Sequence, residues 1–164
     1  MTTPDERDLL LTFLAAQRAA LCNAARGLTE EQAVATPSAS SLSIGGLIKH
    51  ARRAEQGWIH VRTGGRPDPF GGKRDWVEEF RVEPGETLSG LLDAYAAVAR
   101  ESEEIVAGLP DLDVPVELTP RYGGGQGTAR WVLLHMIEEV ARHAGHADVI
   151  RESIDGATAD ELAG

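Results

Sequence analysis

The 164-residue sequence contains a single cysteine, Cys22, and only two lysines, Lys49 and Lys73. One thiol can neither form an intramolecular disulfide nor supply a cysteine-rich zinc site. Cys22 stands among apolar residues in a helical pattern, so we interpret it as a small buried residue rather than a nucleophile. Long apolar runs are missing as well, and a membrane span is therefore not predicted.

Basic residues are too few to balance the acidic ones, and the formal net charge is -10 at pH 7. This charge argues against binding nucleic acid through its phosphates and is typical of a soluble protein. The first residues are charged and lack the apolar core of a signal peptide, which predicts a cytoplasmic location. The length and an apolar content of 42% predict one domain over residues 1–164, with a hydrophobic core.

Apolar residues recur at helical spacing in four long segments, which predicts an all-α protein. The helices are expected at residues 4–25, 43–63, 87–108 and 129–154. Thr3, followed by Pro4, is expected to cap the first helix, and Thr87 the third. Thr29 and Gln32 form a capping-box pattern in the loop after the first helix.

Two long connections separate the later helices. Residues 66–86, rich in glycine and proline, join the second helix to the third and are expected to contain one helical turn around residues 76–80. Residues 109–128 are expected to contain a short extended piece. The glycines at 123–125 do not follow a strand in a βαβ pattern, so they do not indicate a phosphate-binding loop.

Three of the ionisable residues on the second helix differ in their placement on the helical wheel. His50 falls on the shoulder of the apolar face. Glu55 falls near the centre of that face, which predicts a partner for it, because an unpaired buried carboxylate is costly. His60 falls on the polar face and is expected to be exposed.

The densest group of chemically active side chains lies in residues 135–146, which hold three of the five histidines. His135, Glu139 and His143 are spaced i, i+4, i+8, so an α-helix places them along one stripe. Glu139 and His143 can therefore share one divalent metal, and His50 is the best candidate for a third ligand. A solvated or hydrogen-bonded stripe is the alternative interpretation. His135 and His146 fall on the more polar side of the helix.

A set of two imidazole nitrogens and one carboxylate oxygen suits zinc, and also nickel, iron or manganese. Three protein ligands leave coordination positions for water or a thiol, which is typical of catalytic rather than structural sites. The pattern thus indicates a mononuclear metal site inside a helical protein.

These residues give the chain a resemblance to the DinB superfamily. More narrowly, it resembles actinobacterial mycothiol-dependent transferases and the metal-binding domain of mycothiol-dependent maleylpyruvate isomerase. The resemblance covers nearly the whole chain and is carried by residues 47–50 (Leu-Ile-Lys-His), by Glu55 and Trp58, and by residues 131–148. Many DinB-like proteins have a His-x3-His pair on the last helix, whereas this chain has Glu139-x3-His143, as the isomerase does.

The resemblance implies a four-helix bundle with a long crossover between the second and third helices, and metal ligands His50, Glu139 and His143. It also implies a metal-dependent thiol S-transferase, with zinc as the expected metal. The expected cosubstrate is mycothiol or a similar low-molecular-weight thiol, and the expected partners are small electrophiles, with a homodimer possible. In such a reaction His135 or His146 would orient a ligand or shuttle a proton.

Other functions remain compatible with the same residues. The isomerase has an additional C-terminal domain and this chain ends soon after the bundle, so maleylpyruvate isomerisation is disfavoured. A metal-dependent hydrolase or another isomerase of this fold would place water or a substrate oxygen at the open coordination position. A non-enzymatic metal-binding stress protein and a metal-free helical scaffold are the remaining alternatives.

Overall fold

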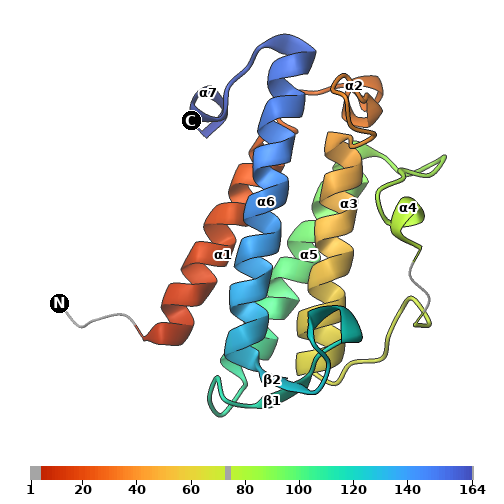
Figure 1. The fold of residues 1–164 in the computed structure, drawn as a ribbon. Coiled ribbons are helices and arrows are strands. Elements are labelled where there is room, and N and C mark those ends of the chain that lie inside the picture. The colour runs from red at the N-terminus through yellow and green to blue at the C-terminus, as the bar shows by residue number, and fades with distance from the viewer. Residues whose placement is uncertain (1–4, 73–74, 164) are drawn as a thin grey trace.

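Helices dominate the computed structural model, which describes residues 5–72 and 75–163 of the chain. Four long helices lie side by side: α1 (Glu6–Asn23), α3 (Ile44–Glu55), α5 (Leu88–Ala107) and α6 (Ala129–Asp155) (Figure 1). A π-helix, η1 (Gln56–Thr63), continues α3. The shorter elements are α2 (Glu30–Val34), α4 (Trp76–Glu79), the 3₁₀-helix η2 (Pro120–Tyr122), α7 (Ala159–Ala163) and the antiparallel strands β1 (Pro115–Glu117) and β2 (Gln126–Thr128). The predicted all-α class is confirmed.

The long helices form a bundle in which α1 and α6 run in one direction and α3 and α5 in the other (Figure 1). Contacts at both ends show that α1 and α6 are parallel. Arg130 at the start of α6 pairs with Glu6 at the start of α1, and Arg151 near its end donates to the carbonyl of Ala24. Since α3 and α5 are also parallel, the chain between them must return along the bundle. This confirms the predicted four-helix bundle with a long crossover, in which α4 is the expected helical turn.

Side-chain caps begin most of these helices where the sequence predicts. Thr29 and Gln32 form the expected capping box at α2, and Thr87 accepts from the backbone N–H of Gly90 at α5. Ser43 and Thr128 cap α3 and α6 in the same way. The predicted cap of the first helix, Thr3 with Pro4, lies outside the described residues. None of the helices in the described ranges is long and apolar enough to cross a membrane.

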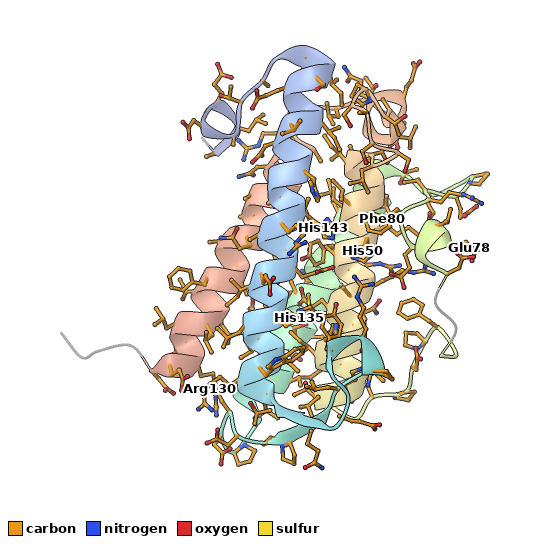
Figure 2. All side chains as sticks on the ribbon, in the orientation of Figure 1. His50, Glu78, Phe80, Arg130, His135 and His143 are labelled. Carbon is orange, nitrogen blue, oxygen red and sulfur yellow. The ribbon has the colours of Figure 1, made fainter. Side chains whose placement is uncertain are left out.

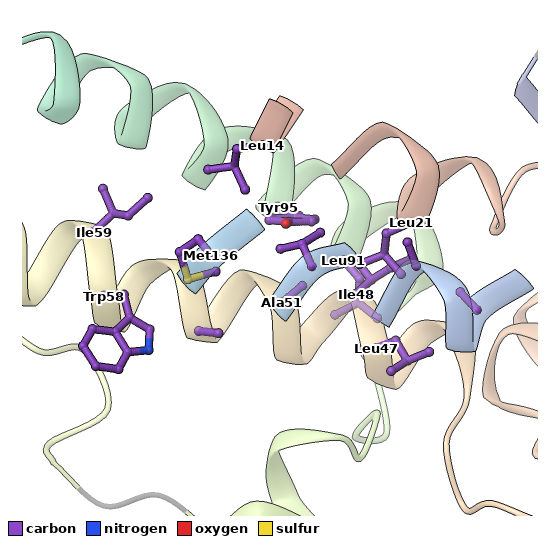
Figure 3. Packing of buried hydrophobic residues seen from close by; sticks show 14 of the residues in the cluster. Leu14, Leu21, Leu47, Ile48, Ala51, Trp58, Ile59, Leu91, Tyr95 and Met136 are labelled. Carbon is purple, nitrogen blue, oxygen red and sulfur yellow. The ribbon is translucent and has the colours of Figure 1, made fainter. Parts of the chain in front are cut away.

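The hydrophobic core fills the space between the four long helices (Figure 3). Leu14 and Leu21 enter it from α1, Tyr95 from α5 and Met136 from α6. Each fully buried leucine or methionine side chain contributes about 1.5–3 kcal/mol to folding. The apolar face expected on the second helix is buried throughout: Ile44, Leu47, Ala51, Ala54 and Trp58.

The buried carboxylate of Glu55 has the partner that its position predicts. Glu55 is 0% exposed, and both of its oxygens accept from the guanidinium of Arg18 on α1, at 2.6 and 3.1 Å. A second carboxylate, from Glu103 on α5, lies 2.9 Å from Arg18 Nη1. The ion pair therefore ties α1, α3 and α5 together inside the bundle.

The π-helix overturns one prediction. His60, expected to be exposed, is 5% exposed, and its Nε2 lies 3.1 Å from the carbonyl of Val98 and 3.0 Å from Oγ of Ser102 on α5. In η1 the backbone N–H of Gly64 bonds to the carbonyl of Ile59, five residues earlier. This wider winding changes the direction of each later side chain from that of an α-helix, and it directs His60 toward α5.

Cys22 packs against the core and is half-buried. Burial raises the pKa of its thiol to about 11, because removal from water disfavours the thiolate. The thiol is therefore uncharged at neutral pH and a poor nucleophile, in agreement with the interpretation drawn from its apolar neighbours.

Candidate metal centre

The three predicted ligands come together between α3 and α6. His50 Nε2 lies 3.0 Å from Glu139 Oε1, and His143 Nε2 lies 3.3 Å from the same oxygen. One ligand atom from each residue falls within 4.8 Å of the other two. Figure 2 shows His50 and His143 in the space between the two helices. The i, i+4 spacing on α6 and the contact of α6 with α3 produce this arrangement.

The electrostatics of the group reflect the sharing of one carboxylate by two imidazoles. Hydrogen bonds from His143 and from His50 hold the pKa of Glu139 far below its ordinary value. Burial alone would lower the pKa of His50, but the hydrogen bonds to Glu139 and to Glu79 raise it above its ordinary value. Glu139 is thus ionised at neutral pH and can serve as an anionic ligand.

The other nitrogen of each histidine also has a neighbour. His50 Nδ1 lies 3.2 Å from Glu79 Oε2, and His143 Nδ1 lies 3.3 Å from His146 Nδ1. His146 itself is exposed, as its polar position on the helix predicts. Its contact with His143 is what the expected ligand-orienting role requires, and that role stays a prediction.

Sequence reasoning did not identify Glu79. This residue lies at the end of α4 in the crossover, 29 positions from His50, and is 3% exposed. A four-residue helix has too few turns to show which face is apolar, so the sequence does not distinguish Glu79 from the exposed Glu78 beside it. Only the tertiary fold brings Glu79 to His50.

His135 lies in a cluster of aromatic rings. It was expected on the polar side of the helix, but it is only 8% exposed. Its ring stacks on Trp131 at 5.0 Å and contacts Trp58 and Tyr122 at 5.1 and 4.6 Å between centroids. Tyr122 comes from η2, in the connection between β1 and β2. The sequence pattern of α6 alone cannot predict that a residue of this connection buries His135.

A cavity of about 210 Å³ opens beside the candidate ligands. His50, Glu79 and Glu139 line it near the ligand group, and His135 and Trp58 belong to its wall. The remaining lining residues include three charged side chains, Arg62, Asp68 and Arg121. The arrangement gives a small molecule access to the ligand group past an aromatic wall and charged residues.

We expect His135 to make the metal-free protein sensitive to acid. Burial lowers the pKa of His135 below its ordinary 6.5, and this outweighs the opposing effect of the carboxylates of Glu139 and Glu138. Below about pH 6.5 His135 therefore binds a proton more readily in the unfolded chain than in the folded one, and the free energy of unfolding decreases. Replacing His135 by phenylalanine should reduce the loss of unfolding free energy between about pH 7.5 and 5. Urea unfolding of both proteins measures this, and parallel pH profiles would contradict the prediction.

Comparison with known families places the chain in one of them. The model of a family described as mycothiol-S-transferase matches residues 9–156, which include all three candidate ligands. The chain belongs to the mycothiol S-transferase family. The resemblance inferred from the sequence is thereby confirmed. No curated protein matches the chain in sequence.

Among solved structures, the fold is similar to the crystal structure of a conserved protein from Enterococcus faecalis. The TM-score is 0.73 at 17% identity, over 94% of this chain and 100% of the other. At this identity the similarity concerns the fold alone. The family is therefore established by the sequence match, and the bundle by the structure and its neighbour.

Proposed function

We propose that the protein is a metal-dependent S-transferase, with zinc as its metal, that joins mycothiol or a similar low-molecular-weight thiol to electrophilic small molecules. The observation that carries this proposal is the convergence of His50 Nε2, Glu139 Oε1 and His143 Nε2 at the edge of a cavity, in a chain of the mycothiol S-transferase family.

The donor set fits a divalent metal. Two imidazole nitrogens and one carboxylate oxygen are the ligand types that zinc takes in catalytic sites, and nickel, iron and manganese also accept them. His50 and His143 are 1% and 7% exposed, whereas Glu139 is partly exposed and faces the cavity from which a thiol would enter. When bound there, such a metal lowers the pKa of a coordinating thiol, so that sulfur becomes nucleophilic near neutral pH.

The chain's own residues provide the remaining functions. Trp58 and Tyr122 form an apolar wall that shields the reacting sulfur from water and packs against the electrophile. His135 lines the same cavity and is uncharged at neutral pH, because burial lowers its pKa. Its imidazole can therefore accept the proton that the thiol releases. A sulfur–carbon bond then forms, and the leaving group departs with its electron pair. Arg62 and Arg121 are placed to attract anionic groups of either substrate.

Elemental analysis of the purified protein and of a His50→Ala, His143→Ala double variant tests the proposal. We expect about one equivalent of metal in the parent and almost none in the variant. In a conjugation assay with mycothiol and a chromogenic aryl chloride, the variant should lose at least about 100-fold in kcat/KM. Glutathione and cysteine serve as comparison thiols.

Each alternative function has its own result. Absence of metal in the parent, even after incubation with zinc and nickel, would contradict the proposal and leave a helical scaffold. Turnover of a substrate without any thiol would favour a hydrolase or isomerase. One bound metal without conjugation of any thiol and electrophile pair would favour a non-enzymatic metal-binding protein.

A further inference from the structure

The crossover between α3 and α5 lies directly on α3 at the level of His50. At Gly46 the two backbones are so close that an added Cβ would overlap the carbonyl oxygen of Phe80. One turn further along α3, the buried Lys49 donates to the carbonyl of Arg81 at 2.8 Å and pairs with Glu86 at 2.6 Å. These contacts fix residues 80–86 on the surface of α3.

The same contacts bring two side chains of the crossover onto His50. Phe80 stacks on the imidazole with a centroid distance of 4.1 Å and an interplanar angle of 18°. Glu79 accepts at Nδ1, while the neighbouring Glu78 points away from the bundle (Figure 2). One face and one nitrogen of the imidazole are thus occupied by the crossover, and Nε2 faces Glu139.

We propose that Glu79 is the positioning residue of the metal centre, an inference that rests on the proposed function. Its carboxylate accepts the Nδ1 proton of His50, so that a metal takes the place of the Nε2 proton, which Glu139 accepts in the metal-free protein, and finds the Nε2 lone pair. Its hydrogen bond and the stacked Phe80 also fix the ring orientation, so that Nε2 is directed at Glu139 and His143 before metal binds.

Charge balance supports the same role. Among the three ligands only Glu139 is anionic, so a divalent ion on this group would keep an uncompensated positive charge in a largely buried site. Glu79, 3% exposed and one imidazole away, supplies a second negative charge next to the ligands. A buried charge is stabilised by such pairing, and metal ligands are commonly supported by a carboxylate in this way.

The test compares zinc affinity in the parent, Glu79→Gln and the matched variant Glu78→Gln, by competition with a chromogenic chelator. Both substitutions remove one charge from α4 and keep the size of the side chain, but at position 79 the Nδ1 proton of His50 then faces an amide oxygen, which is a weaker acceptor than a carboxylate. We expect Glu79→Gln to weaken zinc binding about 10–100-fold and Glu78→Gln to change it less than about 2-fold. Equal zinc affinity in Glu79→Gln and the parent would overturn the positioning role. A parent that binds no zinc would instead refute the proposed metal site.

A second readout separates positioning from a merely structural role. In the ¹⁵N-labelled, zinc-loaded parent, the Nδ1 proton of His50 should give a hydrogen-bonded imidazole signal. This signal should shift in Glu79→Gln and remain in Glu78→Gln. Urea unfolding of the metal-free proteins gives the stability of each. Weaker zinc binding in Glu79→Gln with the histidine signal unchanged would show that Glu79 acts elsewhere and would overturn the inference.

Discussion

Replacing Arg18 by methionine is expected to lower the free energy of unfolding by about 3–5 kcal/mol. The substitution leaves the carboxylate of Glu55, 0% exposed, inside the bundle without the cation that both of its oxygens contact. Solvent cannot take the place of the guanidinium there, so the folded state must either keep a buried charge or protonate it. Urea or thermal unfolding of the metal-free protein measures the loss.

Two comparison variants make this prediction specific. An Arg18→Met, Glu55→Leu double variant removes both charges. It should lose much less of the free energy of unfolding than Arg18→Met alone. Arg130→Met removes an ion pair with Glu6 and Asp113 at the surface, where we expect a cost below about 1 kcal/mol. A double variant as unstable as Arg18→Met would show that lost packing, rather than the unpaired carboxylate, causes the effect.

Gly46→Ala is expected to destabilise the protein by about 1–3 kcal/mol, although alanine is normally the better residue in a helix. The added methyl group would overlap the carbonyl oxygen of Phe80, which belongs to backbone and cannot rotate away. The crossover must therefore move off α3, and Glu79 moves with it. We expect weaker zinc binding in this variant as well as lower stability, measured by urea unfolding and chelator competition.

Gly145→Ala is the matched control for the helical glycine. Gly145 lies inside α6 and has nothing within 4 Å of an added Cβ, so the same substitution there should stabilise the protein by about 0.5–1 kcal/mol. Opposite signs at the two positions would attribute the effect of Gly46→Ala to the contact with the crossover. If Gly46→Ala stabilised the protein, the crossover would be able to move away from the added methyl group without loss of stability.

Much of the fold follows from local sequence patterns. The caps at Thr29 and Thr87 and the apolar stripe from Ile44 to Trp58 are short-range features, and the structure contains each of them. The candidate ligands Glu139 and His143 could be predicted for the same reason, because a helix places residues four positions apart on the same face. His50 was the best candidate for the third ligand from the residues alone, but only the family resemblance implied that the two distant helices bring it to Glu139 and His143.

The features that the sequence missed depend on long-range contacts or on unusual backbone. Glu79 reaches His50 through a crossover whose path is set by Gly46 and Lys49, and no local pattern encodes that path. In the sequence Arg18 is indistinguishable from other polar residues of an amphipathic helix, and only the fold brings it opposite Glu55. The prediction that His60 is exposed was wrong because a helical wheel assumes α-helical winding, and this winding ends at Glu55.

That change of winding also determines how the chain would respond to a change of length at this point. A π-helix accommodates one residue more than the α-helix that would otherwise span the same gap. Deleting one residue before His60 would let the segment wind as an α-helix over nearly the same gap, so the following side chains would keep their directions. Inserting one residue would instead rotate them by about 100°, and His60 would lose Ser102. Between Glu55 and His60, therefore, the chain is expected to tolerate a deletion better than an insertion.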